Sequence, residues 1–205
     1  MDVAAAFPSV ARGCLLQKTR NTGTDEDLVR WTDSFMRDRR VVMSVDGRGD
    51  DAREATTGLP QGSPVSPVLF AIYIAETHEA VESQVEECQR ISFVDGVTWL
   101  VEGAVNEVVQ RLEKCAAASL SWAGDNAVRF GTSKTETILF CRRRKHWREK
   151  AEKPIRVGDR TARFARDATK WLGAWLDSAP ALHENWCWSV SRARQTVAKA
   201  RGLTT

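Results

Sequence analysis

Apolar side chains at helical spacing follow a polar start signal in the first third of the chain. The spacing from Thr24 to Asp27 is that of a capping box. Leu28, Trp31 and Phe35 then recur at intervals of one helical turn. The pattern predicts a helix to about residue 37, with these three side chains facing the core.

Four further segments are also predicted to be helical. In residues 66–82, Ser66 can cap the helix and Pro67 can occupy its first turn, and the first two turns are apolar on every side. We therefore expect this helix to be the most buried one. The others are a helix from Pro8–Ser9 to about residue 18, an amphipathic helix over 105–122 that lies on a sheet, and a C-terminal helix over about 181–201 that Gly202 closes.

Short β-rich runs between the helices predict hairpins. Ile91 to Val101 contains two apolar runs around Asp95-Gly96, a dipeptide that favours a tight hairpin turn. A second hairpin with a charged tip is predicted from 40–45 and 52–57. Other strands are expected at 2–7, 137–141, 155–157, 162–165 and 170–176. Strands and hairpins mixed with helices predict an α+β fold with a largely antiparallel sheet.

Composition and charge add a partner class. The 205 residues are 42% hydrophobic, enough for one domain with a core. Residues 1–141 carry 14 Lys and Arg against 21 Asp and Glu, whereas residues 142–205 carry 16 against 6. This asymmetry favours a polyanionic partner such as nucleic acid for the C-terminal part. The basic residues that suit phosphate contacts, with a solvated surface as the alternative, are Arg142–Lys145, Arg192, Arg194, Lys199 and Arg201.

Cysteine usage and hydropathy indicate where the protein works. The five cysteines are scattered, odd in number and without a C-x-x-C pair, so neither a disulfide framework nor a zinc site is indicated. The longest apolar run, Val68 to Ala75, falls far below the roughly 20 residues that cross a bilayer. We expect no membrane association and an intracellular location, in the nucleus or the cytoplasm.

Two aspartates are the candidate metal ligands. Asp2 opens one β-rich run and Asp95 lies in the predicted hairpin, so only a tertiary fold could bring them together. Nucleotidyl transfer needs divalent cations that carboxylates can hold. The structural alternative is that both are solvated or turn aspartates.

The order of motifs resembles the reverse transcriptases, most closely those of LINE-type, non-LTR retrotransposons. The motifs are DVAAAF from Asp2, GLPQGSPVSP from Gly58, FVD ending at Asp95, SKTE from Ser133 and WLG from Trp171. The LPQGSPVSP segment is highly specific, and the others persuade by their order. The resemblance implies a polymerase palm over residues 1–178, with a mostly antiparallel sheet and helices on one face. It also implies the first helix of a thumb over 179–205.

The resemblance also implies a role for each matching residue. Asp2 and Asp95 would hold two Mg²⁺ (or Mn²⁺) ions, and Lys134 would lie near the leaving pyrophosphate. Phe7 matches the steric gate that selects deoxynucleotides, with a core phenylalanine as the alternative. Residues implied to touch the base pair and template are Gln61 and Gly62, and the implied primer grip is Trp171, Leu172 and Gly173. The implied partners are an RNA template, a DNA primer and a dNTP, and the sequence does not tell which protein partners there are.

Two departures from the family pattern define alternatives. The family's box carries two successive aspartates, whereas here Gly96 stands in the second position. The fingers that precede Asp2 in the family are not found in the sequence, nor is most of the thumb. One hypothesis is an RNA-directed DNA polymerase domain, impaired in this copy. The other is a catalytically inactive remnant that binds nucleic acid through its basic C-terminal part.

Overall fold

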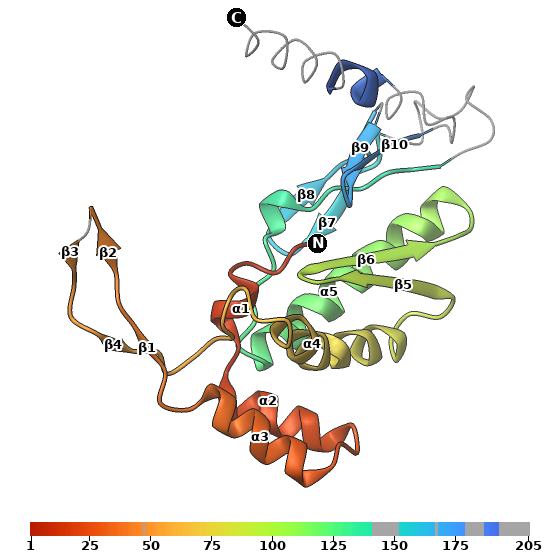
Figure 1. Ribbon diagram of the computed structural model, residues 1–205. Coiled ribbons are helices and arrows are strands. Elements are labelled where there is room, and N and C mark those ends of the chain that lie inside the picture. Colours follow the sequence, from red (N-terminus) through yellow and green to blue (C-terminus); the bar gives the residue numbers. More distant parts are fainter. Residues whose placement is uncertain (47, 141–151, 167, 179–186, 193–205) are drawn as a thin grey trace, which may run out of the picture. The chain divides into compact units, whose positions relative to one another are not determined.

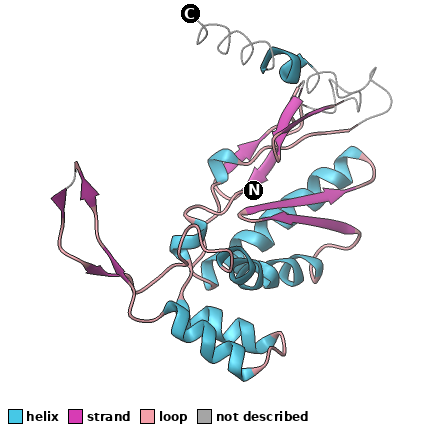
Figure 2. Ribbon diagram, viewed as in Figure 1, coloured by secondary structure: helices cyan, strands magenta, loops and turns pink. Residues whose placement is uncertain are grey.

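A computed structural model describes residues 1–46, 48–140, 152–166, 168–178 and 187–192. The chain divides into two compact units, Met1–Lys134 and Thr135–Thr205. Each unit has its own strand pairs and is described by itself below (Figures 1 and 2).

The first unit contains the main helices. Helix α4 has the predicted bounds and places Phe70, Tyr73 and Ile74 in the core. Ser66 does not cap it, because its hydroxyl donates to the Pro60 carbonyl oxygen at 2.6 Å, while Pro67 occupies the first turn as expected. The helices are α1 (Ala6–Ser9), α2 (Arg12–Asn21), α3 (Glu26–Met36), α4 (Ser66–Glu82), α5 (Val105–Asp125) and the 3₁₀ helix η1 (Thr132–Lys134).

The predicted core face of α3 is wrong for Leu28 and Trp31, whereas Phe35 is partly buried and packs against the core. Leu28 is 57% exposed and Trp31 is 47% exposed, and the latter stacks on Phe35 with ring centroids 5.3 Å apart. The helix instead packs on α2 and buries a second stripe, which consists of Val29, Thr32 and Met36. Both stripes have helical spacing, so periodicity located the helix but not its buried side. The predicted cap also shifts by one residue, because the carboxylate of Asp25 accepts the Asp27 N–H at 2.7 Å.

The predicted hairpin after α3 is confirmed. Strand β1 (Arg40–Val41) pairs with β4 (Arg53–Glu54), and β2 (Ser44–Val45) pairs with β3 (Arg48–Gly49), all antiparallel. Arg39 fixes the base of this hairpin. Its guanidinium donates to the carbonyl oxygens of Met36 at 3.1 Å, Thr57 at 3.0 Å and Gly58 at 2.5 Å.

The central hairpin consists of β5 (Cys88–Phe93) and β6 (Gly96–Val101), paired antiparallel. The predicted turn is displaced by one residue. Phe93 pairs with Gly96, so the turn residues are Val94 and Asp95, and Val94 takes the positive φ of 52°. Gly96 is thus the first strand residue. On the helical side, Val97 is 1% exposed and joins the core formed by α4 residues, and α5 packs against β6 (Figure 1).

The described residues of the second unit form two hairpins. Strand β7 (Ile155–Val157) pairs with β8 (Arg160–Ala162), and β9 (Ala168–Trp171) pairs with β10 (Ala174–Asp177). The single strand predicted over 170–176 is wrong, since Leu172 and Gly173 form a turn with φ of 48° and 85°. Of the strand predicted at 162–165, only Ala162 belongs to a strand, as the last residue of β8, and Phe164 makes an isolated parallel bridge with Thr137. That bridge is the only pairing in the described part of the strand predicted over 137–141.

The α+β class with antiparallel pairing is confirmed. Within the described residues, however, the strands form five separate two-stranded sheets, rather than one continuous sheet (Figure 2). Of the C-terminal helix predicted over 181–201, residues 187–192 are described and helical, and the rest lies outside the described residues. None of the helices in the described ranges is long and apolar enough to span a membrane.

Candidate active site

The backbone brings the two candidate metal ligands to neighbouring positions. Asp2 forms an antiparallel bridge with Gly96. The Val3 N–H donates to the Asp95 carbonyl oxygen at 2.8 Å, and the Val97 N–H donates to the Met1 carbonyl oxygen at 2.8 Å. Residues that are far apart in the sequence are thus adjacent in this unit. Both aspartates are exposed, so their carboxylates are accessible to solvent and ligands.

The strand predicted over residues 2–7 is much shorter than expected. Only Asp2 and Val3 make β-bridges, because Ala5 takes a φ of 50° and α1 begins at Ala6. A tight turn therefore follows the aspartate directly. This turn carries Phe7 into the short helix α1, one turn away from Asp2.

A segment that sequence reasoning missed lies on the other side of Asp2. The Gly131 N–H donates to the Asp2 carbonyl oxygen at 2.8 Å, and the Ala4 N–H donates to the Arg129 carbonyl oxygen at 2.7 Å. Val3 bridges to Phe130 between these two contacts. The available signal was the alternation of buried Val128, exposed Arg129 and buried Phe130, which has the period of a strand.

Lys134 ends the 3₁₀ helix that follows this segment. Its N–H donates to the Gly131 carbonyl oxygen at 3.0 Å, and Gly131 in turn bonds the backbone of Asp2. The Lys134 side chain is exposed. The first unit thus places this lysine one short backbone connection from Asp2.

Position 96 faces the Asp2 carboxylate. A Cβ atom built on Gly96 would lie 3.8 Å from Asp2 Oδ1 and 3.4 Å from the Phe93 carbonyl oxygen. Directly opposed residues of an antiparallel pair project from the same face, which explains this proximity. A side chain at position 96 would therefore share one surface with Asp2.

The GLPQG loop is tied to the segment that follows Asp2. The Leu59 N–H donates to the Phe7 carbonyl oxygen at 2.8 Å, and the Gly58 N–H donates to the Val10 carbonyl oxygen at 2.8 Å. A Cβ atom on Gly58, whose φ is +83°, would lie 2.8 Å from Pro8 Cα. Only glycine allows this backbone approach. The exposed Gln61 and Gly62 follow in the same loop.

Phe7 is half-buried and packs against the core. Its ring meets Phe70 edge-on, with centroids 5.6 Å apart and planes at 85°. This direct contact supports the alternative interpretation, in which Phe7 is a core residue. The backbone of Phe7, through its bond with the Leu59 N–H, is also connected to the GLPQG loop.

Trp171, Leu172 and Gly173 belong to the second unit. Trp171 ends β9, and Leu172, which is 53% exposed, begins the turn to β10. Positive φ values at both turn residues are those of a two-residue hairpin turn that matches the strand twist. The predicted primer grip therefore lies at the tip of a tight hairpin.

A buried histidine on α4 contacts both strands of the central hairpin. Sequence reasoning did not identify it. His78 Nε2 lies 2.7 Å from Ser92 Oγ, and its ring meets Trp99 edge-on with centroids 5.5 Å apart. Burial lowers the pKa of His78, and the nearby Arg90 lowers it further. The signal was its position on the buried face of α4, with Ile74 and Val81.

The candidate donor set for the divalent cations expected from the sequence consists of two carboxylates. Asp2 and Asp95 offer hard, exposed oxygen donors from adjacent backbone segments, which suits Mg²⁺. Within the described part of the chain, no group of three or more His, Cys, Asp or Glu side chains could hold a metal. The residues fit a cation that takes its remaining ligands from water or substrate, with one carboxylate fewer than the family pattern supplies.

Two exposed aspartates on adjacent backbone segments, with a glycine loop bonded to the segment after Asp2, fit the class of template-directed nucleic-acid polymerases. The family described as reverse transcriptase (RNA-dependent DNA polymerase) matches residues 1–176. The chain therefore belongs to the reverse transcriptase family.

Known relatives refine this assignment. The chain is 26% identical over 147 residues to the RNA-directed DNA polymerase from mobile element jockey of Drosophila melanogaster, covering 70% of this chain and 16% of that protein. It is 32% identical over 76 residues to the Pol polyprotein from the type-1 retrotransposable element R2 of Popillia japonica, covering 37% and 12%. The chain spans about a sixth or less of the curated relatives it matches. The predicted resemblance to LINE-type reverse transcriptases is confirmed.

Proposed function

We propose that this chain is the polymerase part of a LINE-type retrotransposon reverse transcriptase. It would extend the 3′-hydroxyl of a DNA primer with dNTPs, directed by an RNA template. The observation that carries this proposal is the Asp2–Gly96 bridge, which puts Asp2 beside Asp95. Family membership over residues 1–176 supplies the reaction class.

In this proposal each site residue has a defined task. Asp2 and Asp95 would hold two Mg²⁺ (or Mn²⁺) ions, which when bound activate the 3′-hydroxyl and stabilise the leaving pyrophosphate. Lys134, which is connected through Gly131 to Asp2, would neutralise charge on that leaving group. Phe7 would exclude a ribose 2′-hydroxyl at the edge of the core.

The loop and the second unit would position the nucleic acid. Gln61 and Gly62 would contact the base pair and the template, supported by the bonds that join Gly58 and Leu59 to α1. The hairpin tip at Trp171–Gly173 would hold the primer. Residues 1–178 would form a palm-like domain, and residues 179–205 would begin the thumb.

Gly96 favours a second candidate function. The position facing Asp2 carries no side chain, so the site has less negative charge to retain cations. An inactive remnant that binds nucleic acid through the basic residues 142–205 would fit this change. For the isolated chain we expect this second function to dominate.

Primer extension on poly(rA)/oligo(dT) with Mg²⁺ or Mn²⁺ tests both candidates. We expect no measurable extension by this chain, and measurable extension once Gly96→Asp is made. Matched Asp2→Asn and Asp95→Asn variants should abolish that extension. Activity that survives either variant would contradict the polymerase site. Salt-sensitive primer-template binding without extension by any variant would favour the remnant.

A further inference from the structure

Two thiols lie in contact at the end of the central hairpin remote from Asp95. Cys88 is the first residue of β5, and Cys115 lies in the middle of α5. Their sulfur atoms are 3.4 Å apart and share a hydrogen bond. Val81, Val85 and Ala118 complete the small apolar cluster around the pair. The packing holds both sulfur atoms next to each other in the folded chain.

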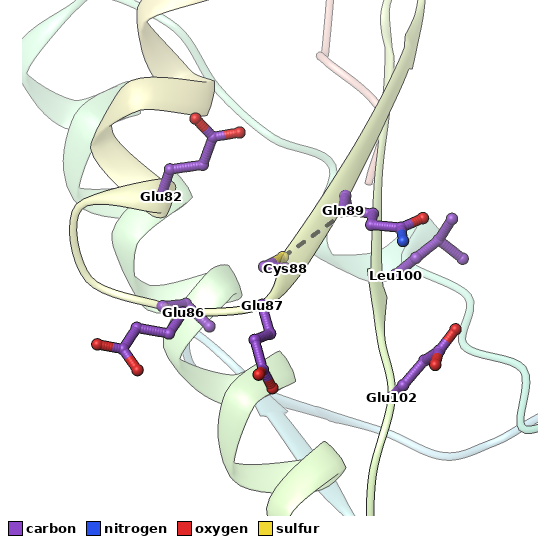
Figure 3. Close-up of a pocket in the computed structure, with 8 residues that line it drawn as sticks. Glu82, Glu86, Glu87, Cys88, Gln89, Leu100 and Glu102 are labelled. Atoms are coloured by element: carbon purple, nitrogen blue, oxygen red, sulfur yellow. Dashed lines mark hydrogen bonds between the residues drawn. The ribbon is translucent and has the colours of Figure 1, made fainter.

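The two thiols differ in access to solvent. Cys115 is fully buried, whereas Cys88 is half-buried and lines a cavity of about 500 Å³ (Figure 3). Glu82, Glu86 and Glu87 are at the same cavity. A small neutral molecule could therefore reach Cys88 through an opening that does not include Cys115.

The hydrogen bond also separates the chemistry of the two thiols. It lowers the pKa of Cys88, and the nearby Arg111 lowers that pKa further, while burial and Glu82 act in the opposite direction. The same hydrogen bond and burial raise the pKa of Cys115. The pKa of Cys88 is therefore lower than that of Cys115, so Cys88 is the thiol of the pair that ionises more readily. Thiolate is the nucleophilic form of cysteine.

We propose that Cys88 is a peroxide-reactive site and that Cys115 resolves it to an intramolecular disulfide. The Cys88 thiolate attacks one peroxide oxygen, the O–O bond breaks, and hydroxide leaves, which gives a sulfenic acid at Cys88. The Cys115 sulfur then attacks the Cys88 sulfur, the S–O bond breaks, and the departing hydroxide takes the Cys115 proton. In total, two thiols and one hydroperoxide give one disulfide and two waters, with hydrogen peroxide as the oxidant.

The geometry requires little movement for this step. A disulfide has a sulfur separation of about 2.0 Å, so the two atoms must approach by about 1.4 Å from their present contact. The bond would fasten the start of β5 to α5. Because the other end of β5 leads into the Val94–Asp95 turn, the cross-link would constrain the hairpin that carries Asp95. This inference is independent of the proposed polymerase activity.

Mass spectrometry of the whole chain tests the proposal. The reduced, folded chain is treated with one equivalent of hydrogen peroxide, alkylated with iodoacetamide, and digested. We expect the intact mass before alkylation to fall by two hydrogens and one cross-linked peptide to join Cys88 to Cys115. Dithiothreitol should restore both thiols. The same treatment in urea should remove the preference for this pair, because the contact depends on the fold.

Variants separate the two roles. In Cys115→Ser or Cys115→Ala, dimedone should trap sulfenic acid at Cys88 and no cross-link should form. The exposed thiols provide matched controls, since Cys14→Ser and Cys187→Ser should leave the cross-link unchanged. Faster oxidation of Cys14 or Cys187 than of Cys88 in the folded chain would overturn the proposal. So would the absence of the Cys88–Cys115 peptide after Cys88 has reacted.

The cavity charge gives a further measurement. Glu82 and Glu87 pair with Arg90 and Arg111, and Glu86 and Glu102 add further negative charge at the opening. Anionic iodoacetate should therefore alkylate Cys88 more slowly than neutral iodoacetamide, relative to the ratio of the two rates at Cys14. An equal ratio at the two cysteines would contradict access through this cavity.

Discussion

Replacing Gly96 with aspartate should create a three-carboxylate site and make the stability of the chain depend on Mg²⁺. The backbone at Gly96 lies outside the positive-φ region, and a Cβ there meets its neighbours at 3.4 Å and 3.8 Å. The substitution therefore needs no large rearrangement. Because the nearer side-chain atom is Asp2 Oδ1, the new carboxylate would face that of Asp2 across the bridge.

The expected magnitude follows from charge repulsion and metal linkage. Two exposed carboxylates about 5 Å apart in water repel by about 0.8 kcal/mol, which lowers the stability of the metal-free variant. That corresponds to a melting temperature lower by about 2–3 °C for a chain of this size. Mg²⁺ at about ten times its dissociation constant would raise the free energy of unfolding by about 1.4 kcal/mol and the melting temperature by about 3–6 °C.

Thermal denaturation with EDTA and with increasing MgCl₂ measures both effects. Gly96→Asn is the matched control, because it has nearly the same shape without the charge. Adding Asp2→Asn to the Gly96→Asp chain should remove most of the Mg²⁺ response. If Gly96→Asp responds to Mg²⁺ no more than Gly96→Asn, position 96 does not share a cation with Asp2, and the inferred arrangement of carboxylates is wrong.

Three further predictions concern the loop, the buried histidine and the basic segment. Gly58→Ala should lower the free energy of unfolding, measured with urea, by at least about 2 kcal/mol, because a Cβ would collide with the backbone of Pro8. Gly62→Ala should lower it by only about 1 kcal/mol, because Gly62 has a similar φ of +89° but open space around the Cβ position. Burial lowers the pKa of His78 below its usual 6.5, so this histidine binds a proton more readily in the unfolded chain than in the folded one. The melting temperature should therefore fall as the pH drops below about 6.5. His78→Gln should make the melting temperature less dependent on pH in this range. Fluorescence anisotropy with a labelled primer-template should show affinity that falls steeply with added salt; salt-independent binding would contradict phosphate contacts by the basic C-terminal part.

Local signals in the sequence located the elements that clear start or stop residues such as Gly and Pro delimit. The bounds of α4 were predicted because Gly and Pro precede Ser66 and Pro67, and a continuous apolar run follows them. The motif order led to the family, since LPQGSPVSP is long and specific. Pairing of Asp2 with the central hairpin was expected only through that resemblance. No local pattern in residues 2–7 determines a partner in residues 95–97.

Tertiary packing determines which face of a helix is buried, and periodicity alone could not predict this for α3. In α3 the stripe with Leu28 and Trp31 is more apolar, yet the stripe with Val29 and Met36 is buried, because the packing partner α2 lies on that side. The exposed aromatic stripe could not be anticipated from one helix alone. The single strand predicted over 170–176 failed for a different reason, since the turn at Leu172–Gly173 has only one glycine and its first residue is an apolar leucine.

The one-residue displacement of the central turn changes whether the backbone requires a glycine at position 96. Had Asp95-Gly96 formed the turn, position 96 would need a positive φ, and glycine there would be a backbone requirement. Val94 takes that φ instead, and Gly96 is an ordinary strand residue opposite both Phe93 and Asp2. Because Gly96 is paired directly with Asp2, a side chain at position 96 shares a face with that of Asp2. The backbone therefore accepts an aspartate at this position, so the missing carboxylate reflects the residue present and not a constraint of the fold.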